Sequence, residues 1–144
     1  MDTIRKIKMF AWKLAWGRLP TSTNLARFSN IPSCKCYVCN EGEDSADHIF
    51  FKCPFAMQLW SCVERYLGLG FKFKDLWPVG GWLKEGLPFD KRSGSKITGL
   101  IAACLWHLWK NRNNICFNKK SNGIFTFLFR ALAEVYKDLP LNLD

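Results

Sequence analysis

Three cysteines and one histidine stand close together in the first half of the chain. They are Cys36, Cys39, His48 and Cys53, separated by two, eight and four residues. A gap of two lets two thiolates hold one metal ion from a tight turn, and Zn²⁺ favours four sulfur and imidazole ligands arranged as a tetrahedron. The polar run after Cys39 is long enough to bring the imidazole back to the thiolates. The spacing therefore predicts a structural Zn²⁺ site that shapes the fold of this segment.

Cys34 leaves one alternative open for the ligand set. It stands two residues before Cys36 and could supply a thiolate in its place. The pair Cys36 and Cys39 is preferred, because two intervening residues is the common chelating gap. The sequence has no secretory signal, so its seven cysteines are not expected to form a disulfide framework. Cys104 and His107 share a helix face but lack a full second ligand set, and packing in the core is the expected role for them.

The residues beside the expected ligands also bear on the site. Pro54 favours a helix start directly after Cys53, and the positive end of that helix favours a thiolate. Asp47 precedes His48 and either orients its second ring nitrogen or is a solvated loop acid. The solvated acid is the preferred interpretation, because most surface acids are unpaired.

Apolar residues recur at helical spacing along most of the chain. The expected helices are one with a stripe from Ile4 to Leu14 that ends at Gly17 and Pro20, a short one after Thr21 or Ser22 that reaches Phe28, one from Pro54 to Tyr66, a long one capped by Ser95 with a stripe from Ile97 to Ile115, and a last one from Phe125 to Tyr136. Residues 31–51 and 71–91 are expected to be loop with short extended pieces. The predicted fold is mainly α: a small helical domain with an irregular zinc-binding insert and few or no strands.

Charge is distributed unevenly along the chain, whose formal net charge is +9. Residues 1–35 carry +6 and residues 91–120 carry +7, whereas residues 36–60 carry −3. Basic clusters of this kind can neutralise phosphates and gain affinity through release of counterions. The candidate nucleic-acid-binding residues are Lys6, Lys8, Lys13, Arg18, Arg27, Lys110, Arg112, Lys119 and Lys120.

Two tryptophans alternate with basic residues near the N-terminus. Trp12 and Trp16 lie among Lys8 and Lys13, a combination that suits stacking on the bases of RNA or single-stranded DNA. Packing of both indoles in the core is the alternative, and it is the preferred interpretation.

Several segments together resemble a known family. They are residues 6–21 (KIKMFAWKLAWGRLPT), 24–27 (NLAR), 36–39 (CYVC), 44–56 (DSADHIFFKCPFA), 59–60 (LW) and, more loosely, 105–117. They are similar to the zinc-binding domain that follows the polymerase in LINE-type (non-LTR) retroelement polyproteins of plants. Asp44 replaces the usual Glu and Ile49 the usual Leu. The resemblance implies that Cys36, Cys39 and His48, with Cys53, bind Zn²⁺, and that the domain assists nucleic-acid handling.

The resemblance and the helical pattern predict three regions. They are a reverse-transcriptase-type zinc-binding domain over 1–70, a loop-rich connector over 71–94, and a helical region over 95–144 that packs on the first. The chain has neither the paired aspartates of the polymerase nor the acidic cluster of ribonuclease H, so it looks like a detached or domesticated retroelement fragment. We expect a non-enzymatic module that binds RNA or single-stranded DNA. The alternative is a protein-interaction module that docks a partner or a second copy through the apolar helix 97–109.

The sequence also bears on where the protein acts. The apolar run over 99–109 is too short to cross about 30 Å of hydrocarbon, so no membrane role is expected. A nuclear or cytoplasmic protein is expected. An organellar one is the alternative, because the basic, helix-forming segment 1–35 has the composition of a transit peptide.

Overall fold

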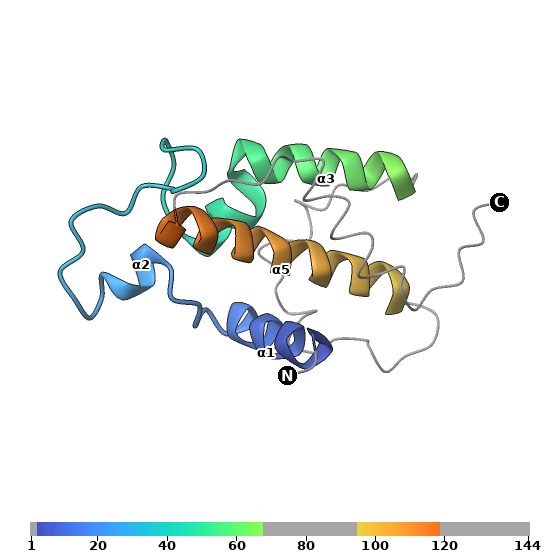
Figure 1. Cartoon of the computed structure of the whole chain (residues 1–144), viewed down its shortest axis with the longest axis horizontal. Helices are drawn as coiled ribbons and strands as arrows, with labels where there is room; N and C mark the ends of the chain where they lie inside the picture. The colour runs from blue at the N-terminus through green and yellow to red at the C-terminus, as the bar shows by residue number, and fades with distance from the viewer. Residues whose placement is uncertain (1–2, 68–94, 119–144) are drawn as a thin grey trace.

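The computed structural model describes residues 3–67 and 95–118 of the chain, and these residues are mainly helical (Figure 1). The elements are α1 (Thr3–Ala15), α2 (Ser22–Leu25), a π-helical turn η1 (His48–Lys52), α3 (Pro54–Leu67) and α5 (Ser95–Asn118). Within the described residues, extended pairing is limited to one antiparallel bridge between Lys35 and Glu43. The predicted fold class is therefore confirmed. The expected connector over 71–94, the last helix from Phe125 to Tyr136, and Lys119 and Lys120 lie outside the described residues.

Helix α1 forms where the apolar stripe predicts it and ends where Gly17 predicts it. The side chains of Ile7, Phe10 and Leu14 are buried. Gly17 has φ of 64°, in the left-handed region, and its N–H donates to the carbonyl of Leu14 at 3.1 Å. The N–H of Arg18 donates to the carbonyl of Lys13 at 2.7 Å, which completes a Schellman cap. The cap turns the chain back toward α2.

Helix α2 is a single turn whose N-cap is Thr21 rather than Ser22. The Thr21 hydroxyl accepts a hydrogen bond from the N–H of Asn24 at 3.3 Å. The Asn24 side chain donates to the carbonyls of Gly17 and Leu19 at 3.1 and 2.8 Å, so it ties α2 to the end of α1. The Ser22 hydroxyl donates a hydrogen bond to Asp44 of the zinc-binding insert instead, as described below.

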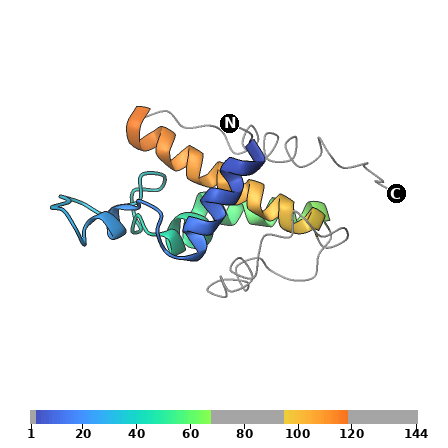
Figure 2. The same cartoon turned by 90° about the horizontal axis from the view of Figure 1, so that it is seen from below.

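The core lies where α1, η1, α3 and α5 meet. Figure 1 shows α5 running between α1 and α3, and the view from below shows α1 crossing α5 (Figure 2). The ring of Phe10 on α1 packs edge-on against Phe50 of η1 and against Trp106 of α5, with ring centroids 5.8 and 5.4 Å apart, respectively. Complete burial of one such aromatic side chain contributes about 1.5–3 kcal/mol. These aromatic contacts hold residues distant in sequence as one unit.

Helix α3 packs through one apolar face. Ala56, Leu59, Trp60 and Val63 are all buried. The indole N–H of Trp60 donates to the carbonyl of Phe50 at 2.6 Å, which fastens α3 to η1. Among the described residues, no helix is long and apolar enough to span a membrane.

The turn η1 was not predicted, because the sequence pattern of residues 31–51 indicated only loop and short extended pieces. Its side chains Ile49, Phe50 and Phe51 are all buried. The N–H of Cys53 donates to the carbonyl of His48 at 2.7 Å, five residues back, which is the π-helical bond. Three adjacent apolar residues show no helical stripe, so periodicity alone gives no signal for this turn.

Candidate metal centre

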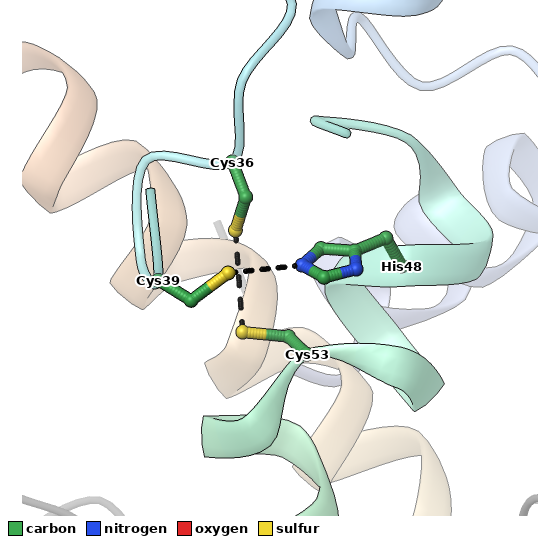
Figure 3. Close-up of side chains that lie close together, drawn as sticks. All are labelled: Cys36, Cys39, His48 and Cys53. Atoms are coloured by element: carbon green, nitrogen blue, oxygen red, sulfur yellow. Dashed lines mark hydrogen bonds between the residues drawn. The ribbon is translucent and has the colours of Figure 1, made fainter. Parts of the chain in front are cut away.

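Four side chains converge at one point between the insert and the start of α3. Cys36, Cys39, His48 and Cys53 point toward one another (Figure 3), and their ligand atoms all lie within 4.8 Å of one another. The Sγ atoms of Cys36 and Cys53 are 4.0 Å apart, and Cys39 Sγ is 3.2 Å from His48 Nε2. Zn–S bonds of 2.3 Å in a tetrahedron separate two sulfurs by about 3.8 Å. The cluster therefore has the size and the donor set of a tetrahedral Zn²⁺ site.

The first two ligands are presented by a tight turn. The N–H of Cys36 donates to the carbonyl of Gly42 at 2.7 Å, and the N–H of Asn40 donates to the carbonyl of Cys36 at 2.9 Å. Asn40 closes the turn with φ of 62°, a left-handed conformation that asparagine adopts more readily than most residues. The N–H of Val38 points at Cys36 Sγ at 3.4 Å and stabilises negative charge on that sulfur.

The other two ligands come from the two ends of η1. His48 opens the turn, and Cys53 follows it directly before Pro54 and α3. The His48 ring lies against Gly42, where a Cβ atom would overlap the imidazole. Gly42 is therefore required for close approach of the backbone to the ligand, a role that sequence reasoning did not assign.

The thiols of the cluster are polarised by one another. The hydrogen bond between the Cys36 and Cys53 side chains is the main cause that lowers the pKa of Cys36 to about 5, although burial acts in the opposite direction. The same hydrogen bond raises the pKa of Cys53, and burial raises it further. One sulfur is thus ready to bind a cation as thiolate, while the other must lose its proton when Zn²⁺ binds.

The structure resolves both alternatives around the ligands. Cys34 is not among the four converging residues; its carbonyl accepts a hydrogen bond from the N–H of Asp44 at 2.7 Å. The carboxylate of Asp47 forms an ion pair with Lys52 at 2.7 Å on an exposed surface, so Asp47 is a surface acid as preferred, but a paired one. The protein supplies all four ligands of a tetrahedral site, which is the pattern of a structural Zn²⁺ site.

Sequence reasoning missed Asp44, which is completely buried beside the cluster. Its Oδ2 atom accepts hydrogen bonds from the backbone N–H and the hydroxyl of Ser22, at 2.9 and 2.7 Å. Its Oδ1 atom accepts from Arg112 Nε at 3.0 Å, and Arg112 Nη2 binds Oδ2 as well. Asp44 therefore joins the zinc-binding insert to α2 and to α5. The available signal was its place in the family motif, where an acid is usual.

The position of Arg112 contradicts its predicted contact with nucleic acid. Its side chain is only 4% exposed, and its guanidinium lies 5.0 Å from the ring centroids of both Tyr37 and Trp109. A guanidinium fully occupied in the interior is not presented to a phosphate. The other predicted basic residues within the described part, Lys6, Lys8, Lys13, Arg18, Arg27 and Lys110, are exposed.

The observed burial also bears on two further expectations, that the apolar helix 97–109 docks a partner and that Trp12 and Trp16 lie in the core. The described apolar side chains of the helix 97–109, from Ile101 to Leu105 and at Leu108 and Trp109, are already buried within the chain. They leave little apolar surface there for a partner. Trp12 and Trp16, in contrast, were expected in the core but are 53% and 54% exposed.

The comparison with known families agrees with the ligand geometry. Residues 2–60 match the model of the family described as zinc-binding in reverse transcriptase. No curated protein and no solved structure matches the chain. The matched segment contains all four converging ligands, the Asp44 carboxylate and helix α1. Residues 2–60 therefore match the zinc-binding domain of reverse transcriptase, and they contain the four side chains that form the candidate Zn²⁺ site.

Proposed function

We propose that this zinc-binding domain binds single-stranded nucleic acid, RNA or DNA, through the solvent side of α1. We define this outer α1 face as Lys8 and Trp12 of α1, Trp16 and Arg18 of the turn that directly follows it, and Lys13 at the edge next to the groove described below. Lys8, Trp12 and Trp16 are spaced by four residues and so follow one another along a single side of the helix.

The observation that carries the proposal is the exposure of two indoles on a basic helix. Trp12 and Trp16 are each more than half exposed, although the core is built from the opposite side of α1. Exposed indoles can stack on bases, and each stacked base contributes about 1–3 kcal/mol. Bases of a duplex are already stacked on their neighbours, so the outer α1 face suits unpaired strands.

The basic side chains lie where the backbone of such a strand would pass. Lys8, Lys13 and Arg18 are exposed, and the Arg18 guanidinium lies 5.7 Å from the centroid of the Trp12 ring. A cation beside an aromatic face can contact a phosphate while the indole contacts the adjoining base. The zinc site supports this arrangement indirectly, because it fixes η1, against which α1 packs through Phe10.

The test is fluorescence anisotropy of the zinc-loaded chain with labelled single-stranded RNA and DNA. Trp12→Ala and Trp16→Ala should each weaken binding about tenfold, which corresponds to one lost stacking contact. Lys8→Gln should reduce the salt dependence of binding by roughly one counterion. Phe28→Ala is the matched control, because Phe28 is an exposed aromatic outside α1 (88% exposed). Equal affinities for the parent chain and Trp12→Ala would contradict the proposal.

A further inference from the structure

A largely apolar groove of about 550 Å³ lies between α1, the loop around α2 and the C-terminal half of α5. Its volume is in the range of ligand-binding pockets, about 300–1,000 Å³. Met9, Leu25 and Phe117 line it and are exposed, Phe117 to 75%. Large apolar side chains gathered around one hollow are typical of a docking surface. We call it the α1–α5 groove.

The tyrosine and tryptophan rings of this groove are less accessible than the indoles of Trp12 and Trp16, because Trp109 is buried and Tyr37 and Trp106 are partly buried, and this argues against a stacked nucleobase as occupant. Arg112 covers Tyr37 and Trp109, and the Lys110 ammonium lies 5.8 Å from the Trp106 ring centroid. Two polar groups of the wall are engaged as well. The Ser22 hydroxyl donates to Asp44, and the Asn113 carbonyl oxygen accepts from Arg112 at 2.8 Å. The wall therefore offers contact to apolar side chains and little for the edge of a base.

The rim of the groove carries positive charge from α1. Lys6 and Lys13 both line it and are exposed, and none of its described lining residues is acidic. The charge of Arg112 is neutralised by Asp44. Residues seven apart on a helix lie on the same side, about 10.5 Å apart along the axis. The groove thus presents two cations, two helical turns apart, beside an apolar floor.

From this complementarity we infer that the α1–α5 groove docks an amphipathic, acidic helix of a protein partner. The partner helix lies along α1 and carries acidic side chains at positions i and i+7, opposite Lys6 and Lys13. Apolar side chains at i+3 and i+4 enter the groove against Met9, Leu25 and Phe117. Met9 adapts its flexible thioether chain to the shape of these anchors.

The test uses a labelled helical peptide with Glu at i and i+7 and Leu at i+3 and i+4, titrated into the zinc-loaded full chain. A second peptide has Lys in place of both Glu residues. Saturable binding of the acidic peptide is expected. Phe117→Ser should weaken it at least tenfold, whereas Phe28→Ser, at a still more exposed site outside the groove, should not. Lys6→Glu combined with Lys13→Glu should abolish binding of the acidic peptide and permit binding of the basic one.

Three outcomes would overturn the inference. One is no binding of the acidic peptide at its highest soluble concentration, and another is equal binding to the parent chain and Phe117→Ser. The third is competition, in which single-stranded RNA displaces the peptide and Phe117→Ser weakens RNA binding as well, since the groove would then belong to a nucleic-acid surface. Trp12→Ala keeps the two proposals separate, because it should weaken RNA binding and leave peptide binding unchanged.

Discussion

The carboxylate of Asp44 and the guanidinium of Arg112 form a buried ion pair between residues 68 positions apart in the sequence. Asp44 belongs to the zinc-binding insert, and Arg112 belongs to α5, which lies beyond the segment that matches the family. The guanidinium also lies against Tyr37, inside the turn that presents Cys36 and Cys39. Helix α5 is therefore part of the structural unit that forms the metal site.

Replacement of Arg112 by Leu should lower the free energy of unfolding by about 3–5 kcal/mol, because Asp44 would remain buried without its cation. The measurement is urea unfolding of the zinc-loaded chain, followed by circular dichroism. Arg27→Leu is the matched control, because Arg27 is exposed, and it should change the free energy by less than about 0.5 kcal/mol. A loss for Arg112→Leu no larger than that of the control would contradict the role of the ion pair.

The Asp44 carboxylate should also make stability depend on pH. Burial alone would raise the pKa of Asp44, but hydrogen bonds from Arg112 and Ser22 hold it below its ordinary value. A lowered folded-state pKa stabilises the fold above about pH 3.9, the pKa in the unfolded chain, and this stabilisation disappears as pH falls through the folded-state pKa. Asp44→Asn should therefore be clearly less stable than the parent chain at pH 7.

The stability difference between the parent chain and Asp44→Asn should shrink as the solution is acidified below pH 4. Comparing the two chains at each pH separates this effect from release of Zn²⁺, which both undergo. Asp47→Asn is the control, because Asp47 forms an exposed ion pair with Lys52, and pairs of this kind contribute little. A difference that stays constant from pH 7 to below pH 4 would show that Asp44 does not titrate as proposed.

The elements that follow from local pattern were predictable, and those that depend on distant partners were not. The stripe of α1, its end at Gly17 and the start of α3 at Pro54 can be read from spacing and backbone preference. The four ligands can be read from the gaps between them. The burial of Asp44 depends on Arg112, and the turn η1 depends on packing against α1 and α5. Neither partner is visible to a local pattern.

The prediction that the two tryptophans are buried was wrong for a related reason. The resemblance to the family favours the core for Trp12 and Trp16, because family members keep these tryptophans in an apolar context. The buried stripe of α1 runs through Ile7, Phe10 and Leu14 instead, and positions 12 and 16 lie away from it. Helical geometry therefore overrides residue type in placing these two side chains.

The segment that matches the family should not fold stably without α5. A fragment over residues 1–67 keeps the four ligands but loses the aromatic contacts of Phe10 with Trp106 and of Phe50 with Trp109. It also loses Arg112. Asp44 would then either stay buried without its cation or reach water by opening the insert. We expect at least a tenfold weaker Zn²⁺ affinity in competition with a chromophoric chelator, and reduced helical circular dichroism. Parent-like affinity and helicity of the fragment would contradict this dependence.

Removal of the metal ion should unfold the insert, because metal binding and folding of this segment are one equilibrium. Chelation at pH 7 should reduce near-ultraviolet circular dichroism and increase amide hydrogen exchange over residues 34–56. Cys53→Ser should reproduce the effect, whereas Cys34→Ser should bind Zn²⁺ normally, because Cys34 does not point into the cluster. Equal loss of Zn²⁺ in both variants would place Cys34 in the ligand set.

Two glycine substitutions should separate ligand geometry from backbone strain. A Cβ atom at Gly42 would overlap the His48 ring, so Gly42→Ala should displace the imidazole and weaken Zn²⁺ binding at least tenfold. Gly17→Ala meets no neighbouring atom, but its φ of 64° is left-handed, and alanine there should cost about 1–2 kcal/mol in the free energy of unfolding. Its Zn²⁺ affinity should stay close to that of the parent chain. Chelator competition measures the Zn²⁺ affinity, and urea unfolding measures the free energy of unfolding. Similar Zn²⁺ affinities for both variants would exclude close packing of His48 against Gly42.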